Sequence, residues 1–268
     1  MQNAMRIAMM SGKRGPKPPA YGGLCFTAEA DNSSIQLTAA GSAPAVTLVK
    51  SFDGVNWEAY TVGEVIDLPS TGDFVYLAAG EGGNETFGSS SSAYHQFVIK
   101  GLVAASGDIT SLRRFDLEQT TLASSCYRFM FTDCTGLTSA PELPATTLAD
   151  SCYRNMFDGC TGLTSAPELP ATTLANYCYD SMFYGCTGLT SAPELPATTL
   201  NTYCYRFMFT DCTNLSLIKV RFTAWGRSQT ASWVSGVSRT GTFYKPTALP
   251  EKHGTSRIPP GWTVVNID

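Results

Sequence analysis

Histidine is nearly absent from this chain. Only His95 and His253 occur among 268 residues, and they are far apart in the sequence. Phosphate-binding loops, dinucleotide fingerprints and nucleophile elbows are also missing. Because catalysis needs titratable groups brought together, the sequence indicates a protein that is not an enzyme and that uses neither a cofactor nor a metal. We expect both histidines to be solvated.

The sequence also lacks long apolar runs and clustered basic residues. No apolar run approaches the roughly 18 residues that a membrane-spanning helix needs. The formal net charge is −4, and the cations of the first 28 residues stand there without any acid. The rest of the chain is therefore more acidic than the total, which argues against nucleic acid as a partner. We expect no membrane insertion.

The N-terminal tail, residues 1–20, is basic and ends in a proline-rich stretch. Its apolar segment, residues 7–10, is short, is broken by Ser11 and Gly12 and is followed by Lys13 and Arg14, so it matches a secretory signal poorly. We interpret the tail as a docking peptide or linker. Its candidate anchoring residues are Arg6, Lys13, Arg14 and Lys17.

Short runs of alternating apolar and polar residues fill residues 21–116, with glycine, proline and aspartate between them. This pattern predicts antiparallel strands and a β-sandwich. The segment 51–57 contains Asp53-Gly54, which predicts a hairpin turn. It also resembles the aspartate box of sialidases, although one residue is missing between Asp53 and Gly54. Together with Trp57 and Tyr60, that resemblance leaves a carbohydrate-binding unit as an alternative.

A 26-residue period runs through residues 117–217, shown most clearly by two rows of cysteines: Cys126, Cys152, Cys178, Cys204 and Cys134, Cys160, Cys186, Cys212. A period of this length predicts a solenoid. Within a unit, apolar residues from Leu148 to Cys160 recur at spacings that we interpret as one face of a helix, capped by Thr146 or Thr147. The proline-rich segment 163–170 predicts a short extended strand. Residues 218–268 predict a C-terminal cap ending in a strand at 263–267.

The cysteines of one unit are too far apart to form a disulfide bond. Eight residues on a helix span about 12 Å, which is beyond disulfide reach. Equivalent cysteines of adjacent units could approach each other, but buried, reduced packing residues are the favoured interpretation. Zinc is disfavoured, because its usual ligand pairs are two to four residues apart and histidine is scarce.

The repeat unit resembles the BspA-like leucine-rich repeat. Met182-Phe183-x-x-Cys186-x-x-Leu189 is similar to the core of that repeat, and so are the segments 130–137, 156–163 and 208–215. The resemblance covers about a third of the chain, but the period is longer than is usual in the family. It implies a mixed β and α/β fold: an N-terminal β-sandwich, then a short strand-helix leucine-rich-repeat solenoid with a C-terminal cap.

The same resemblance implies non-catalytic adhesion or structural binding, in proteins of Bacteroidales and their phages. The layout, including the ending at 258–264, is similar to phage virion proteins such as fibre, tail or capsid decoration proteins. The implied partners are other virion proteins at the tail and a host surface protein or glycan, with a homo-oligomer as a further option. The expected location is the virion. The alternative is an exported adhesin on the bacterial cell surface.

Variation between the repeats suggests where binding could occur. The extended segment is identical in the complete copies, whereas the residues Arg128, Arg154, Asp180, Tyr184 and Arg206 lie on the variable part. One interpretation is solvent-facing drift, which we favour, and the other is a diversified contact face. The ladder Glu142, Glu168 and Glu194 is a further candidate, because stacked like charges repel unless a cation lies over them, although we favour a solvated row of screened charges.

Overall fold

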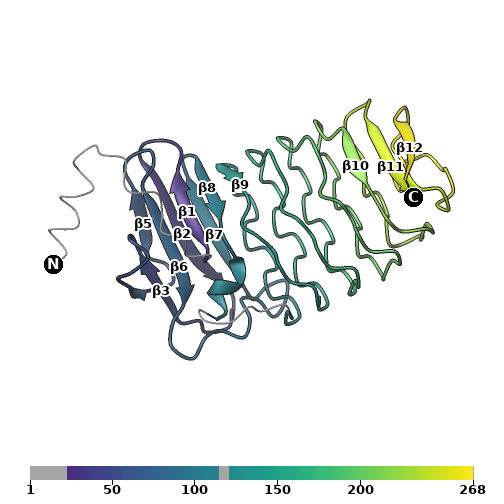
Figure 1. Ribbon diagram of the computed structural model, residues 1–268. Coiled ribbons are helices and arrows are strands. Elements are labelled where there is room, and N and C mark those ends of the chain that lie inside the picture. Colours follow the sequence, from purple (N-terminus) through teal and green to yellow (C-terminus); the bar gives the residue numbers. More distant parts are fainter. Residues whose placement is uncertain (1–22, 115–120, 268) are drawn as a thin grey trace.

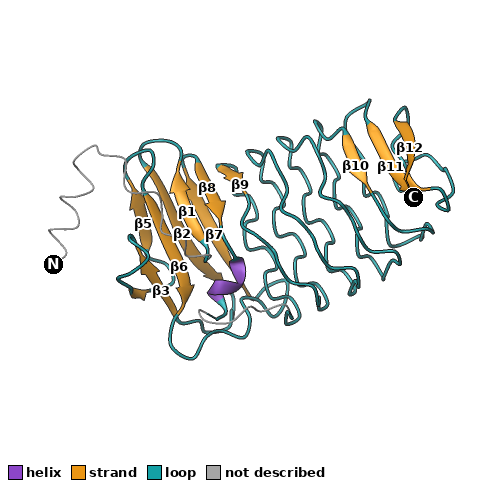
Figure 2. Cartoon of the chain, viewed as in Figure 1, coloured by secondary structure: helices purple, strands orange, loops and turns teal. Residues whose placement is uncertain are grey.

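The computed structural model describes residues 23–114 and 121–267 of the chain (Figure 1). Two sheets lie at the N-terminal end, a three-stranded sheet lies at the C-terminal end, and turn-rich segments connect them (Figure 2). The strands are β1 (Cys25–Ala28), β2 (Ser33–Ala40), β3 (Leu48–Ser51), β4 (Glu58–Tyr60), β5 (Val65–Leu68), β6 (Phe74–Ala79), β7 (Tyr94–Lys100), β8 (Val103–Ser106), β9 (Leu137–Ser139), β10 (Leu217–Lys219), β11 (Thr242–Pro246) and β12 (Thr263–Ile267).

The N-terminal part contains a six-stranded sheet, in the order β4-β3-β6-β1-β8-β9, and a three-stranded sheet, β5-β2-β7. Alternate residues of β2 are buried, as the apolar pattern of a half-buried strand predicts. The sheets touch through Phe26 of β1 and Phe97 of β7, whose ring centroids are 4.8 Å apart. The hairpin expected at Asp53 joins β3 to β4, and the Asp53 carboxylate accepts hydrogen bonds from the backbone N–H groups of Val55 and Asn56.

The repeats consist of consecutive β-turns. Every second N–H group bonds three residues back, as Met130 N–H does to Tyr127 O at 3.2 Å. The N–H groups between them bond to the next repeat, as Phe131 N–H does to Met156 O at 2.8 Å. Every fourth residue has a positive φ, for example 57° at Ser125 and 61° at Phe129. Each repeat is therefore one layer, bonded along its length to the following layer.

The predicted strand-helix leucine-rich-repeat solenoid is wrong. Within residues 23–114 and 121–267 the structure contains no α-helix, and its one helical element is the short 3-10 helix η1 (Ile109–Leu112). The apolar residues recur at an exact four-residue period, which an α-helix of 3.6 residues per turn would turn off its face by about 40° each time. Consecutive turns keep that period. Thr146 and Thr147 consequently cap no helix.

The extended segments mostly lack regular strand pairing. β9 is the one strand found in the repeats between residues 121 and 215. Two prolines in each segment, such as Pro167 and Pro170, have no N–H group to give to a neighbouring layer. Isolated parallel bridges remain, including Thr147 with Thr173. Parallel strands return in β10, β11 and β12, where the proline pattern ends, and β12 is the strand expected at 263–267.

Two columns of aromatic rings run through the layers. Successive tyrosine centroids are 5.9 to 6.0 Å apart in Tyr127, Tyr153, Tyr179 and Tyr205. Successive phenylalanine centroids are 5.4 to 5.8 Å apart in Phe131, Phe157, Phe183 and Phe209. The columns begin on Phe87 and Phe97 of the N-terminal part and both end on Trp233. The core is thus continuous from the N-terminal sheets to the C-terminal sheet.

All nine cysteines are free and buried. The Cys160 thiol donates to Phe131 O of the preceding layer across 3.0 Å, and Cys186 and Cys212 donate in the same way to Phe157 O and Phe183 O. Burial raises the pKa of Cys152 to about 12, so this thiol stays protonated. No helix of the described residues is long and apolar enough to cross a membrane.

The consecutive turns make a prediction at Ser151, whose φ is 59°. We expect Ser151→Gly to be more stable than Ser151→Ala by about 1 kcal/mol, because glycine has no Cβ to oppose a positive φ. In an α-helix the order would reverse by a similar amount. Urea unfolding of the two variants measures the difference, and a more stable alanine variant would contradict the turn structure.

Candidate functional site

The alternation of buried and outward residues in each layer creates an outward face. Cys152 and Tyr153 are buried, the next pair points outward, and Met156 and Phe157 are buried again. One row of equivalent outward positions across the layers contains Arg128, Arg154, Asp180 and Arg206. These candidates from the sequence therefore lie on one side of the molecule.

Asp180 is buried between two arginines from the layers on either side of it. Its side chain is 0% exposed. Arg206 holds the carboxylate with two donors, Nε at 3.1 Å and Nη2 at 2.7 Å. Arg154 Nε lies 2.9 Å from Oδ2, as an ion pair without the alignment of a hydrogen bond. A buried carboxylate needs such compensation, so Asp180 is a holding group for the arginines and is not itself available for contact.

Aromatic rings support the arginines. The Arg206 guanidinium lies 4.6 Å from the Tyr203 centroid, and Arg154 lies 5.4 Å from the Tyr177 centroid. Arg128 lies 4.9 Å from the ring of Phe129. Contacts of this kind are worth about 0.5 to 1 kcal/mol at exposed sites. We define the arginine–aromatic face as Arg128, Arg154, Asp180 and Arg206 together with Tyr94, Phe129, Tyr177, Tyr203 and Phe207.

The aromatic residues of this face were not among the candidates from the sequence. Tyr177 and Tyr203 directly precede a cysteine, and Phe129 and Phe207 directly follow an arginine. On the assumed helix they had no common side. The signal that could have found them is the strict four-residue period, which places them between the buried pairs.

Tyr184 and the glutamate ladder lie apart from the arginines. Tyr184 is 38% exposed, and a hydrogen bond to the carboxylate of Asp211 raises its pKa. Glu194 pairs with Lys219 and with Arg221, each at 2.7 Å, and these contacts lower its pKa. At Glu194 two cations of the chain itself therefore contact the ladder. Glu142 and Glu168 are exposed.

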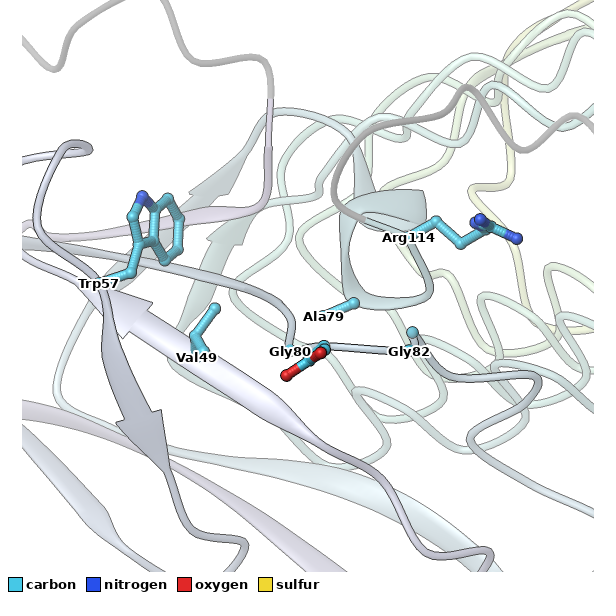
Figure 3. A pocket seen from close by; sticks show the side chains of 8 residues that line it. Val49, Trp57, Ala79, Gly80, Gly82 and Arg114 are labelled. Atoms are coloured by element: carbon cyan, nitrogen blue, oxygen red, sulfur yellow. The ribbon is translucent and has the colours of Figure 1, made fainter.

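A cavity of about 470 Å³ lies in the N-terminal part. Trp57 and Arg114 stand on opposite sides of it, with the backbone of Gly80 and Gly82 between them (Figure 3). Tyr60 belongs to the core instead: it is 5% exposed, and its hydroxyl accepts from Leu37 N–H. Of the two aromatic residues proposed for carbohydrate binding, Trp57 alone lines this cavity.

The expectation that both histidines are solvated is wrong for His95. His95 is 2% exposed, and its Nδ1 lies 3.0 Å from Phe87 O. Burial lowers its pKa, because the imidazolium would lose its hydration. His253 is exposed, with Nε2 3.2 Å from the Glu251 carboxylate. The His95 ring is thus part of the core, and the His253 ring lies at the surface.

The candidate anchoring residues Arg6, Lys13, Arg14 and Lys17 lie outside the described residues. No protein-family model, curated protein or solved structure matches the chain. The function is therefore inferred from the geometry of the described residues.

Asp180 provides a test of how the face is held. We expect Asp180→Ala to lower the free energy of unfolding by about 3 kcal/mol, because Arg154 and Arg206 lose their buried carboxylate. The triple variant Arg154→Met/Asp180→Leu/Arg206→Met serves as the control and should be at least as stable as the parent, since it removes all three charges. Urea unfolding measures both. An Asp180→Ala variant as stable as the parent would show that the ion pairs do not organise the face.

Proposed function

We propose that this protein is a non-enzymatic binding module and that the arginine–aromatic face is its contact surface. The observation that carries the proposal is the position of Asp180, which holds Arg154 and Arg206 beside half-buried aromatic rings. Arginine and tyrosine supply much of the binding energy at protein contact surfaces. Side chains already held in place lose little conformational entropy when a ligand binds.

The layered structure supports this proposal. Hydrogen bonds between layers and the two aromatic columns limit movement of one layer relative to the next. The spacing of the outward residues is therefore set by the backbone. A rigid surface that presents several rings and guanidinium groups suits a polar ligand with a flat ring face.

The setting we propose is a phage particle, in which the module contributes to host-surface adhesion or to assembly. The support is the layout of the sequence, with its basic N-terminal segment. We expect mass spectrometry of purified particles to find the chain beginning near Met1. A chain shortened at its N-terminus and located in a bacterial outer-membrane fraction would instead favour the exported adhesin.

A second candidate function is carbohydrate binding at the cavity beside Trp57. The observation that favours it is the indole on the cavity wall opposite Arg114. An aromatic ring can stack against the apolar face of a sugar, and a guanidinium can donate to its oxygens. This function would use the N-terminal part of the protein instead of the repeats.

One binding experiment separates the two surfaces. We expect Tyr177→Ala/Tyr203→Ala to weaken attachment of the labelled full-length protein to intact Bacteroidales cells by at least about tenfold, the effect of losing 1.4 kcal/mol. Flow cytometry across a panel of strains measures attachment. Thr146→Ala/Thr172→Ala, exposed on the extended segments, is the matched control and should bind like the parent.

The same assay includes Trp57→Ala. Loss of attachment in Trp57→Ala, with the double tyrosine variant unaffected, would move the contact to the cavity and refute the proposed face. Equal attachment of every variant would refute both surfaces.

A further inference from the structure

Arg128 is the arginine of the face that has no carboxylate. Its Nε is buried and has no hydrogen-bond partner among the described residues. Arg154 and Arg206 share Asp180. Within the described ranges, residues 23–114 and 121–267, Arg128 makes no ion pair. Burial, and then the charge of Arg154, lower the pKa of Arg128, and the charge of Asp180 opposes them only in part. The guanidinium remains charged and is partly removed from water, so a bound anion would supply compensation that the described residues do not.

Arg154 is the neighbour that completes a site. It occupies the equivalent position in the next layer, and Asp180 contacts it through Nε, leaving its terminal nitrogens for other acceptors. Its side chain is 27% exposed. Two guanidinium groups in successive layers can hold the two oxygens of one carboxylate, because each offers a planar fork of donors.

The neighbouring carboxylates favour an anion with a single negative charge. Asp133, Asp150 and Asp158 are on the outward side of the same layers. Asp158 accepts from Asn155 Nδ2 at 2.8 Å, and Asp150 accepts from Asn176 N–H at 3.0 Å. They would repel a phosphate or a polyphosphate more strongly than a group with a single negative charge. A carboxylate fits this balance better than nucleic acid does.

The surrounding rings select what carries the carboxylate. Phe129 and Tyr94 pack with their centroids 4.7 Å apart, and Arg128 lies over Phe129. Both rings are half-buried, so each keeps some exposed area. Ser124 is exposed in the adjacent outward row. An apolar ring face for stacking, a hydroxyl partner and a monoanion partner together match an acidic sugar.

We propose that Arg128 and Arg154 form a subsite for the carboxylate of an acidic sugar, a uronic or sialic acid residue of a surface glycan, with Phe129 and Tyr94 packing against the sugar ring. The site names the ligand class for the arginine–aromatic face, and it therefore rests on the proposed function. It gives Arg128 an anionic partner that the described residues do not supply.

The test uses the full-length protein, with an oligogalacturonate as the probe and its methyl ester as the neutral control. Isothermal titration calorimetry at low salt should show that the acid binds at least about tenfold more tightly than the ester, because only the acid offers a carboxylate to the two guanidinium groups. Poly-glutamate tests whether the carboxylate alone suffices, and inorganic phosphate tests a simple anion. Both should bind more weakly than the oligogalacturonate.

Variants of Arg128 complete the experiment. Arg128→Gln should reduce oligogalacturonate affinity to that of the ester with only a small fall in the unfolding midpoint, because the variant loses the contact with the Phe129 ring but no carboxylate partner. Arg128→Lys should retain part of the affinity, since it keeps the charge and loses the planar fork. Arg239→Gln, at an exposed arginine away from the face, should bind like the parent.

Several outcomes would overturn the acidic-sugar site: no binding of the oligogalacturonate, equal binding of the ester, tighter binding of poly-glutamate or phosphate, or full affinity in Arg128→Gln. The cell-attachment assay distinguishes this failure from failure of the proposed function. If the acidic sugar is refuted while Tyr177→Ala/Tyr203→Ala still loses attachment, the face remains the contact surface and its ligand is of another class.

Discussion

The rest of the structure depends on the hydrogen bonding between one 26-residue layer and the next. In the first three repeats, every second N–H group of a turn segment bonds a carbonyl 25 residues further along the chain, as in Tyr153 to Cys178 at 3.1 Å. This bonding fixes the register of the layers. Equivalent rings of successive layers then stack, and the planes of the Tyr153 and Tyr179 rings are parallel, with an interplanar angle of 0°. A shift of register would separate every ring from its partner and leave polar backbone groups unpaired in the core.

The outward face follows from the same register. Because buried and outward pairs alternate along each turn segment, a residue at one outward position stands beside the residues one layer before and after it. That is why Asp180, the one acid in a row of arginines, pairs with both Arg154 and Arg206. Arg128 stands one layer further away and has no such partner. The asymmetry between Arg128 and the other arginines therefore comes from a single repeat that differs from its neighbours.

Part of this architecture could be predicted from the sequence because it depends on local chemistry. The alternation at 35–38 and 74–77 predicts strands that lie within β2 and β6, and Asp53-Gly54 predicts the β3–β4 hairpin. The turn segments could not be assigned in the same way. A run such as Cys152-Tyr153 followed by Met156-Phe157 is compatible with a wide helical face. Ser151 and Asn155 have a positive φ although neither is glycine, so the sequence gives no signal for a turn at these two positions. Bonds between layers, which are remote in sequence, select turns over a helix.

The sequence by itself determined the period, the positions that vary between repeats and the burial of the cysteines and aromatic residues, because these follow from identity and spacing along the chain. Only the tertiary structure decided what each varying residue does. Asp180 and Tyr184 both look like surface substitutions in the sequence, yet one is fully buried between two guanidinium groups and the other is exposed beside Asp211. The physical reason is that the partner of each side chain belongs to another layer, 26 or 27 residues away, so its environment exists only once the layers are stacked.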